Sequence, residues 1–523
     1  MEAMMYLDQH AINHPDRAAI IMASTGKTIS YSEFEGRANQ LAHVLRSEGL
    51  QRLDHYSIFM ENNEWYMESC AAGERAGSYY TCMNSFLTAE ELAYILSNSR
   101  SEVLVTSTSK AHTALEALDG APDVRKVFVC GGVPSDISDP RMVDYAEATS
   151  SMPTTPIEDE SLGTPMLYSS GTTGRPKGIL RPLPDQAPAE MLPLYTFLLN
   201  LWQYREGMIY LSPAPLYHSA PQAAVSLTLR AGGTVIVMEK FDPVDYLRLI
   251  ETYSVSHSQL VPTMFSRMLK LSDEQRLQFD LSSLEFAVHA AAPCPVKVKH
   301  QMIEWWGPII HEYYGATEGL GFAACDSEQW LSHPGTVGKI VLGEVHVMDD
   351  EMNELPNGTP GTLWFGSGTE FSYLDDPEKT KESTSPDGTM TTVGDIGYVD
   401  DDGFLYLTDR KTFMIISGGV NIYPQEIEDL LITHPKVFDA AVFGVPNEDL
   451  GEEVKAVIQV MPDITAGDEL TEELLEHCRE HLSRQKVPRS IDYEAELPRL
   501  PTGKLYKRLL RDRYWGGGTN KIV

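Results

Sequence analysis

The fold and chemistry of this chain are decided by Tyr168-Ser169-Ser170-Gly171-Thr172-Thr173-Gly174-Arg175-Pro176-Lys177-Gly178. This stretch follows Met166-Leu167, which is typical of the end of an apolar strand. Its glycines let the backbone approach a ligand closely, its hydroxyls can donate to phosphate oxygens, and Lys177 adds positive charge. The Walker pattern is excluded, because no Gly-Lys-Ser/Thr occurs here. The stretch predicts a phosphate-binding loop, and a Gly/Ser/Thr surface turn is the alternative.

Apolar strand patterns and helical patterns alternate around this loop. Ser32-Glu33-Phe34-Glu35 has the form of a capping box and predicts the start of a helix. Predicted strands are Tyr56–Met60, Val103–Thr106, Lys126–Cys130 and Thr234–Met238. The chain has 523 residues, 42% of them hydrophobic, which is enough for a sizeable core and for more than one domain. We predict an α/β fold with layered α/β subdomains and largely parallel sheets.

The clearest domain boundary is near residue 410. Upstream, Gly394–Leu407 predicts two strands joined by an Asp-Asp-Gly turn. Downstream, Val437–Phe443 and Val454–Val460 predict strands, and apolar residues from Leu470 to Leu482 line one face of a helix. We therefore predict a large N-terminal domain (1–409), a hinge (410–413) and a small, mobile α+β C-terminal domain (414–523).

Charge and cysteine content limit the partners of the chain. Lys plus Arg is 41 and Asp plus Glu is 75, a formal charge of −34, which disfavours nucleic acid and anionic membrane. The six cysteines are scattered without metal-site spacing, as expected for reduced thiols. No signal peptide is evident, and no stretch reaches the roughly 20 apolar residues of an integral membrane segment. We predict a cytoplasmic protein and leave open whether it forms a homodimer.

The glycine-rich loop closely resembles the phosphate-binding signature of the adenylate-forming superfamily. That group comprises acyl- and aryl-CoA synthetases, peptide-synthetase adenylation domains and beetle luciferases. The resemblance continues in family order through further segments, which are Tyr313–Gly319, Thr392–Asp395 with Tyr406–Arg410, Ile415–Glu428 and Leu497–Lys504. The chain is identified as a member of the acyl-CoA synthetase branch. This membership implies a carboxylic acid substrate, with ATP, Mg²⁺ and the co-substrate CoA.

The resemblance implies roles that suit the chemistry of each side chain. Tyr314 offers a flat face for adenine, and Asp395 can accept from both ribose hydroxyls. Thr317 offers a hydroxyl for phosphate and Glu318 a carboxylate for Mg²⁺. Lys504 would bridge the acid carboxylate and the α-phosphate. Without the family context, Tyr313–Gly319 would be read as the start of a helix, and Asp395 as a turn residue.

The resemblance implies three groups of site residues. The catalytic residues are Lys504, Thr317 and Glu318, and the metal ligands are Glu318 and Thr173. The cofactor-binding residues are Ser169, Ser170, Gly171, Thr172, Thr173, Gly174, Lys177, Ala291, Ala292, Pro293, Tyr313, Tyr314, Gly315, Ala316, Asp395, Arg410, Gly418, Gly419 and Tyr423. The acid-binding residues are Tyr217, His218, Val261, Ala290, Gly319 and Leu320.

The identity of the acid follows from what surrounds these positions. The acid-binding segments are small or apolar and lack a Lys or Arg for a second carboxylate and an Asp for an amino group. Small residues at Ala290-Ala291-Ala292, Gly319 and Gly321 leave room for a large group. We predict an apolar medium- or long-chain acid, or a bulky alicyclic, steroid-like acid. His218 is interpreted as a gate to this site or as a core histidine.

Two features leave the mechanism open. Family members usually carry Lys or Asp, often followed by Asp, where this chain has Thr412 and Phe413, so the hinge departs from the family pattern. The resemblance implies that the C-terminal domain rotates about this hinge between adenylation and thioester formation. The acceptor is also open, because a stand-alone enzyme could load a carrier-protein thiol instead of CoA. A non-enzymatic nucleotide-binding relative is the third reading, but it predicts loss of Lys504 or Glu318, and both are present.

Overall fold

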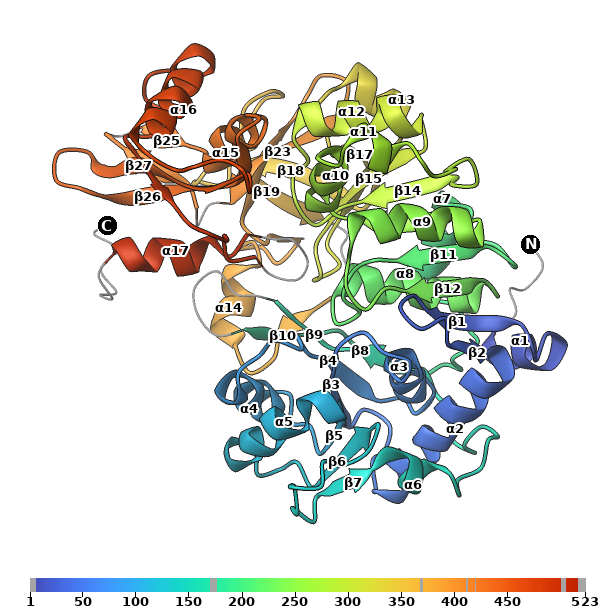
Figure 1. Ribbon diagram of the computed structural model, residues 1–523. Coiled ribbons are helices and arrows are strands. Elements are labelled where there is room, and N and C mark those ends of the chain that lie inside the picture. The colour runs from blue at the N-terminus through green and yellow to red at the C-terminus, as the bar shows by residue number, and fades with distance from the viewer. Residues whose placement is uncertain are drawn as a thin grey trace. The chain divides into compact units, whose positions relative to one another are not determined.

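The computed structural model describes residues 6–169, 176–366, 370–410, 413–418, 420–499 and 505–515, with backbone only at 169, 409 and 410 (Figure 1). The chain divides into two compact units. The first unit consists of Met1–Gln259, Asp273–Ala287 and Thr369–Lys381. The second unit consists of Leu260–Ser272, Val288–Gly368 and Glu382–Val523. Strands β13 (His257–Leu260) and β14 (Phe286–His289) each contain a point where the chain passes between units.

A parallel sheet forms one layer of the first unit, in the order β7-β6-β5-β3-β4-β8. Its strands are β3 (His55–Phe59), β4 (Tyr79–Cys82), β5 (Val103–Ser107), β6 (Lys126–Cys130), β7 (Met142–Asp144) and β8 (Thr164–Pro165). Figure 1 shows helices on both of its faces. They are α4 (Ala89–Asn98) and α5 (Ala111–Ala117) on one face, and α2 (Tyr31–Ser47), α3 (Tyr66–Arg75) and α6 (Tyr145–Thr149) on the other. Right-handed crossovers produce this arrangement, because the strand order reverses between β4 and β5.

The core of this layer is made by apolar side chains on one face of the sheet. Leu92 and Leu96 of α4 and Ala114 of α5 pack on Leu104 and Val127, all fully buried. The strands are buried on both faces, which explains why they read as continuous apolar runs. The four strands predicted from 56–60, 103–106, 126–130 and 234–238 are confirmed within one residue at each end.

The first unit contains two more sheets. One has the order β2-β1-β12-β11-β13 and is parallel except for the β1–β2 pair. Its further strands are β1 (Ala18–Met22), β2 (Thr28–Ser30), β11 (Ile209–Ser212) and β12 (Thr234–Val237). The same unit contains helices α1 (Leu7–Asn13), α7 (Pro193–Leu201), α8 (Ser219–Arg230), α9 (Pro243–Tyr253) and α11 (Asp273–Arg276). The other is antiparallel, with β20 (Ser372–Tyr373), β10 (Lys177–Leu180) and β9 (Leu167–Ser169). α14 (Pro377–Glu382) follows β20.

The capping box of α2 lies two residues earlier than predicted. Ser30 is the N-cap, its hydroxyl accepts from the Glu33 backbone, and the Glu33 carboxylate accepts from the Ser30 backbone. Ser32 lies inside the first turn and donates to the carbonyl of Pro15. The prediction from Ser32 and Glu35 was therefore wrong in register, because Ser30 and Glu33 have the same spacing and Ser30 follows a strand that ends at the helix.

The second unit contains an antiparallel sheet in the order β15-β16-β17-β23-β22-β19-β18. Its strands are β15 (Ile310–Gly315), β16 (Phe322–Cys325), β17 (Gly338–Leu342), β18 (Glu344–Met348), β19 (Gly361–Gly366), β22 (Asp395–Val399) and β23 (Phe404–Arg410), and β21 (Met390–Thr391) pairs with β19. The prediction of largely parallel sheets is wrong for this part of the chain. Short turns join β15 to β16 and β22 to β23, and a short turn returns the chain antiparallel. Helices α10 (Pro262–Leu269), α12 (Val296–Trp306) and α13 (Ser327–Ser332) belong to the same unit.

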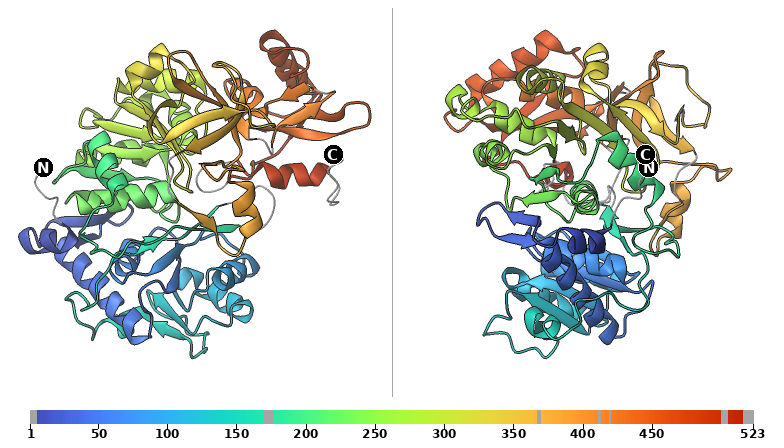
Figure 2. Two further views of the ribbon diagram at one scale, coloured as in Figure 1. Left: turned by 180° about the vertical axis from the view of Figure 1, so that it is seen from behind. Right: turned by 90° about the vertical axis from the view of Figure 1, so that its right-hand side faces the viewer.

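The C-terminal part of the second unit has its own sheet, in the order β25-β24-β27-β26 with β28 beside β27. Its elements are β24 (Ile415–Ser417), β25 (Val420–Ile422), α15 (Pro424–Ile432), β26 (Val437–Asn447), β27 (Gly451–Val460), α16 (Asp468–His481), β28 (Ser490–Tyr493) and α17 (Lys507–Tyr514). Both faces of β26 are covered, as Figures 1 and 2 show. Ala440 and Val442 pack with α15 and α16, whereas Ala441 and Phe443 pack with Leu510 of α17.

These elements confirm the predicted α/β class and the predicted strands and helix of the C-terminal part. The mixed α/β architecture, with a large N-terminal and a small C-terminal domain, is that of the predicted fold class. Among the residues that the structure describes, no helix has the length and apolar character needed to cross a bilayer.

Candidate active site

The predicted phosphate loop connects two adjacent antiparallel strands. The Cα of Ser169 in β9 is paired with that of Lys177 in β10, so the two described ends of the loop are adjacent. Tyr168 is held at the base of this connection, since its hydroxyl donates to Asn98 Oδ1 at 2.7 Å. Ser170, Gly171, Thr172, Thr173 and Gly174 lie outside the described residues, as does the side chain of Ser169.

Lys177 is the described basic residue of this loop, and it forms an ion pair. Its ammonium group donates to Asp376 Oδ2 and lies 6.0 Å from the centre of the Tyr373 ring. The pairing lowers the pKa of Asp376, which also accepts from the backbone N–H of Lys379 at 2.9 Å. A phosphate group that binds Lys177 must therefore compete with a carboxylate of the same unit. Sequence reasoning did not find Asp376, because nothing near it in the chain marks it.

The segment Tyr313–Gly319, which we call the second motif, lies in a β-hairpin. Tyr313 and Tyr314 lie on β15, in register with Ala324 and Ala323 of β16, and residues 316–321 form the loop. The reading of this segment as a helix start is therefore wrong. The ring of Tyr313 stacks on Phe322 with centroids 4.9 Å apart. The hairpin thus fixes two neighbouring tyrosines on opposite faces of one strand.

Tyr314 and Asp395 contact each other directly. The hydroxyl of Tyr314 donates to Asp395 Oδ2 at 2.7 Å, and the Tyr314 ring lies 6.1 Å from that of Phe365. Asp395 begins β22 and is only 7% exposed. The turn before it is held by Thr392, whose Oγ1 accepts from the N–H of Gly394 at 3.0 Å. An aromatic face and a carboxylate are thereby placed together from distant motifs.

The loop of the hairpin carries the predicted catalytic pair. Thr317 is half-buried and Glu318 is 7% exposed. Gly319 has φ +79°, and its N–H donates to the Ala316 carbonyl at 3.0 Å, which closes a turn that requires a left-handed residue. Leu320 is buried directly after it, so the loop is pinned at its far end. Gly315, at the end of β15, is exposed.

Gly321 is small for a different reason from the predicted one. A Cβ at this position would lie 2.4 Å from Cδ1 of Phe365. The space beside Gly321 is therefore filled by an aromatic ring of the same sheet, and the prediction that it leaves room for a large acid was wrong. The same ring contacts Tyr314, so Gly321 lets Phe365 support the tyrosine.

The predicted acid-binding residues come from both units. In the first unit, Tyr217 is buried and His218 is the N-cap of α8, with ring centroids 4.5 Å apart. Burial raises the pKa of Tyr217. In the second unit, Val261 is the N-cap of α10 and Ala290 follows β14, and both are buried. Each of these positions is at the end of a strand or the start of a helix, where ligand sites of α/β folds are found.

Ala291 has an unusual backbone conformation. Its φ is +75°, which residues with a Cβ rarely adopt. It is followed by Ala292 and Pro293, and these three predicted cofactor-binding residues join β14 to α12. The strained turn lies within the predicted site, where such strain is common.

Strand pairing brings together the ends of two motif segments, Thr392–Asp395 and Tyr406–Arg410, which we call the ribose motif. Asp395 of β22 is paired with Arg410 of β23, so the backbones of the two predicted nucleotide-binding residues are adjacent. The side chain of Arg410 lies outside the described residues. Phe413, at the end of the predicted hinge, lies 5.5 Å from the ammonium group of Lys507.

Gly418, one of the predicted cofactor-binding residues, lies between the paired strands β24 and β25. Ser417 of β24 pairs with Val420 of β25, and Gly418 between them has φ +57°, as tight hairpin turns require. The N–H of Gly418 donates to the Leu450 carbonyl at 2.9 Å. Tyr423 is the N-cap of α15, and Pro424 lies in the first turn of this helix. Gly419 lies outside the described residues.

The described part of the segment Leu497–Lys504 is held by specific contacts, although Lys504 itself lies outside the described residues. Arg499 and Leu505, which lie on either side of this segment in the chain, form an isolated antiparallel bridge. The guanidinium group of Arg499 donates to both carboxylate oxygens of Asp439. Leu497 is buried against Phe443. Asp439 and Phe365 were missed from the sequence, because their roles depend on partners far along the chain.

These features define an enzyme that binds a nucleotide, and comparison with known proteins gives its family. Residues 7–372 match the AMP-binding enzyme family, and residues 426–504 match the AMP-binding enzyme C-terminal domain. The chain belongs to the AMP-binding enzyme family. ATP and CoA are substrates that fit this family.

Relatives and solved structures match nearly the whole chain. The 3-[(3aS,4S,7aS)-7a-methyl-1,5-dioxo-octahydro-1H-inden-4-yl]propanoyl:CoA ligase of Rhodococcus jostii is 28% identical, over 92% of this chain and 93% of the relative. The fatty acid–[acyl-carrier-protein] ligase ScoC of Streptomyces coeruleorubidus is also 28% identical, over 98% and 96%. The crystal structure of ATP-bound MatB from Rhodopseudomonas palustris superimposes with a TM-score of 0.80 at 27% identity, covering 98% of this chain and 99% of that one.

Proposed function

We propose that the protein is an ATP-dependent acid–CoA ligase. The observation that supports the proposal is the hydrogen bond between Tyr314 and Asp395, because an aromatic ring beside a carboxylate suits an adenine base and ribose hydroxyls. Membership of the AMP-binding enzyme family supports the same reading. Relatives along the full length of the chain include a CoA ligase, which supports thioester formation as the second step.

The proposed reaction has two steps. In the first, a carboxylate oxygen of the acid bonds to the α-phosphorus of ATP, and the bond to the β-phosphate oxygen breaks, so pyrophosphate leaves. In the second, the thiol sulfur of CoA bonds to the acyl carbon, the carbon–oxygen bond to AMP breaks, and the thiol proton passes to solvent. The first step needs no general base, because the acid is ionised at neutral pH. The acid carboxylate and ATP are both anions and must be aligned. Lys177, Lys504 and the hydroxyls of the phosphate loop would align them.

Mg²⁺ fits the residues that would hold it. Glu318 supplies a carboxylate from the hairpin loop and is 7% exposed, and Mg²⁺ prefers such an oxygen together with nucleotide phosphates. Thr173, the other proposed ligand, lies outside the described residues. The ion would neutralise phosphate charge when bound. Thr317 of the same loop would contribute a phosphate contact through its hydroxyl.

The proposed acid is apolar, either of medium or long chain or bulky and alicyclic. Tyr217, Val261 and Leu320 are buried apolar positions in the proposed acid-binding set. The relative from Rhodococcus jostii is named for a fused-ring propanoyl group, and the relative from Streptomyces coeruleorubidus is named for a fatty acid. The second of these transfers to an acyl-carrier protein, so loading of a carrier-protein thiol is the alternative function.

A panel of acids assayed for pyrophosphate release, with and without CoA, tests the proposal. Medium-chain, long-chain and alicyclic acids should give much more pyrophosphate than acetate or amino acids, and acyl-CoA should accumulate with CoA present. Preferred turnover of acetate or an amino acid would refute the apolar acid. Pyrophosphate release without formation of acyl-CoA, together with transfer of the acyl group to a purified acyl-carrier protein, would favour the alternative.

Two variants separate the half-reactions. Lys504→Ala should slow acid-dependent pyrophosphate release by several orders of magnitude, because it removes a charge contact made during adenylation. The same variant should convert pre-made acyl-adenylate and CoA at close to the parent rate. Gly419→Leu should do the reverse, since it would block the path of the pantetheine arm. Equal loss of both half-reactions in Lys504→Ala would refute a two-state mechanism.

The domain division belongs to the same proposal. We propose residues 1–409 and 414–523 as domains that alternate about a hinge at 410–413. Thr412→Pro should slow thioester formation more than adenylation, because proline restricts φ where the chain must rotate, whereas Thr412→Lys should change neither rate much. A cytoplasmic location and a homodimer are proposed as well, and cell fractionation and light scattering of the purified chain test them.

A further inference from the structure

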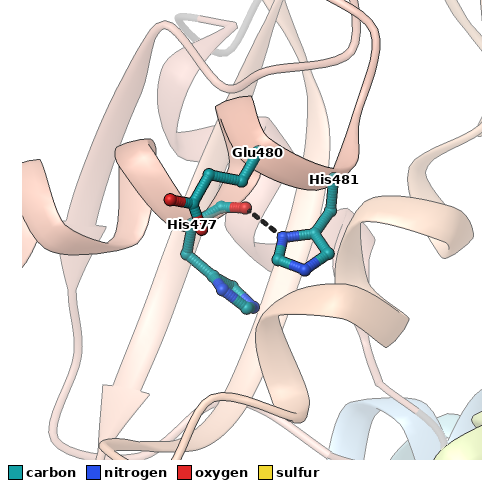
Figure 3. A group of neighbouring side chains, drawn as sticks. All are labelled: His477, Glu480 and His481. Atoms are coloured by element: carbon teal, nitrogen blue, oxygen red, sulfur yellow. Dashed lines mark hydrogen bonds between the residues drawn. The ribbon is translucent and has the colours of Figure 1, made fainter.

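Three chelating side chains meet in the last turn of α16, far along the chain from the nucleotide motifs. They are His477, Glu480 and His481, which we call the α16 cluster (Figure 3). Each offers one ligand atom, and these atoms all lie within 4.8 Å of one another. It is the only such group of three His, Cys, Asp or Glu side chains in the part of the chain that the structure describes.

The spacing of the α16 cluster is that of a helical chelate. Residues three and four apart lie on the same face of a helix, so His477 and His481 present their rings side by side. Their ring centroids are 4.7 Å apart. In a tetrahedral zinc site with Zn–N bonds of about 2.0–2.1 Å, ligand atoms are about 3.4 Å apart. Glu480 and His481 are exposed, so rotation of their side chains can close the remaining gap.

The ring of His481 is arranged as that of a metal-binding histidine usually is. His481 Nδ1 lies 2.8 Å from the His477 carbonyl oxygen (Figure 3). A ligating histidine commonly donates one ring N–H to a carbonyl, which leaves its other nitrogen for the metal. His477 Nε2 is buried and has no hydrogen-bond partner among the described residues.

The helix that carries the cluster is acidic. The sequence of α16, Asp468–His481, carries six carboxylates and one arginine; Glu472 and Glu476 pair with Arg479, and Glu473 pairs with Lys436. The cluster also lies at the C-terminal end of the helix, where the helix dipole is negative. His434 packs its ring edge-on against His477, with centroids 5.1 Å apart, and so restricts the orientation of that ring. Cys478 points instead into the core with Leu474, so its thiol does not compete for the metal.

We propose that the α16 cluster is a binding site for a divalent transition metal such as Zn²⁺, with His477, His481 and Glu480 as ligands. Two imidazoles and one carboxylate select Zn²⁺, Co²⁺, Ni²⁺ or Cu²⁺ over Mg²⁺, which prefers oxygen ligands. The site is thus chemically distinct from the proposed Mg²⁺ position at Glu318. Because the ligands lie on one helix that packs against α15 and β26, the metal would stabilise the C-terminal sheet.

The test uses the full chain, freed of any affinity tag and treated with a chelator, in excess Mg²⁺. Co²⁺ is the probe, because a site with nitrogen ligands gives visible absorption bands. All six cysteines are buried, so thiols contribute little. We expect one equivalent of Co²⁺ to bind, Zn²⁺ to displace it, and Zn²⁺ to raise the unfolding temperature.

Matched variants assign the ligands. His481→Gln should weaken Co²⁺ binding at least tenfold, and the double variant His477→Gln/His481→Gln should abolish it. His300→Gln removes an exposed histidine of another helix, α12, and should bind as the parent does. The single variant lies on the surface, so its fold is expected to be kept, and circular dichroism without metal checks this. The proposal is refuted if the parent fails to bind Co²⁺, or if His481→Gln binds it as tightly as His300→Gln. Pyrophosphate release by His481→Gln should match the parent, so this result is independent of the proposed ligase function.

Discussion

The hydroxyl of Tyr314 donates to Asp395 Oδ2 across 2.7 Å, although 81 residues separate the two in the chain. The bond joins the strand of the second motif to the start of the ribose motif, and both lie in one sheet of the second unit. Phe365 backs the tyrosine ring, and Gly321 makes space for Phe365. The orientation of the proposed nucleotide site therefore depends on a small set of contacts behind the residues that would touch the ligand.

Removing the Tyr314 hydroxyl should weaken ATP binding without removing the adenine platform. Hydrogen bonds to charged groups contribute about 1.5–3 kcal/mol, so Tyr314→Phe should raise the KM for ATP by about tenfold or more. Tyr314→Ala should have a larger effect, because the ring is lost as well. Tyr398→Phe serves as the control and should be close to the parent, since the Tyr398 ring stacks on Tyr406 and that stacking is kept. Initial rates of pyrophosphate release give the KM. An unchanged KM in Tyr314→Phe would mean that the hydroxyl does not position Asp395 for the nucleotide.

A side chain at Gly321 should damage the fold and not the choice of acid. Its Cβ would lie 2.4 Å from the Phe365 ring, and overpacking of this kind costs about 1–3 kcal/mol. Gly321→Ala should lower the unfolding temperature and slow adenylation of all acids to a similar extent. The double variant Gly321→Ala/Phe365→Leu should recover part of the stability.

Gly467→Ala is the matched control, because a Cβ there meets nothing within 4 Å. Selective loss of bulky acids in Gly321→Ala, with unchanged stability, would restore the interpretation that this glycine makes room for substrate.

Loss of the Arg499–Asp439 contact should misplace Lys504. The two-bond contact fixes Arg499, which precedes Lys504 by five positions in the chain. Displacement of a catalytic group by about 1 Å can cost about a hundredfold in rate. Arg499→Ala should therefore slow adenylation ten- to a hundredfold while sparing thioester formation from pre-made adenylate. Arg513→Ala removes an exposed pair with Glu494 and should change neither rate. Parallel losses in both half-reactions of Arg499→Ala would contradict a role limited to the lysine loop.

Glu68 should make the stability of the first unit depend on pH. Burial raises the pKa of this carboxyl to about 7, although Arg37 lies 3.7 Å away and Tyr145 donates to it at 2.8 Å. The folded protein thus holds a proton that the unfolded chain releases near pH 4.5. Stability should fall as pH rises from about 4.5 through 7, because the unfolded state then binds fewer protons than the folded state.

Glu68→Gln should cancel this loss. The variant should gain about 1–3 kcal/mol over the parent at pH 8 and little at pH 4.5. Denaturant unfolding at the two pH values measures the difference. Glu116→Gln, at an exposed position of α5, should follow the parent at both. A Glu68→Gln variant that tracks the parent at pH 8 would show that the carboxyl is ionised at no cost in the folded chain.

Much of the fold followed from local patterns. The strand at Lys126–Cys130 was predicted with its observed bounds, because a continuous apolar run between turns is the signature of a strand buried on both faces. The family and its motifs were also readable from the sequence, since each motif is a short contiguous segment whose residue types suit phosphate, ribose or metal. The pairing direction of the later strands was not readable, because it depends on how short turns return the chain.

The sequence by itself determined which kinds of side chain could meet a nucleotide, an acid and a thiol. Only the tertiary structure decided which residues support them: Phe365 behind Tyr314, Asp376 on Lys177 and Asp439 on Arg499. Each of these partners lies 51 or more positions from the residue it supports, and no local periodicity marks it. The use of Gly321 was misjudged for the same reason, because Phe365 lies 44 positions from it in the chain. A local pattern specifies what a residue is able to do, whereas its neighbours in space determine which of those uses the folded chain makes.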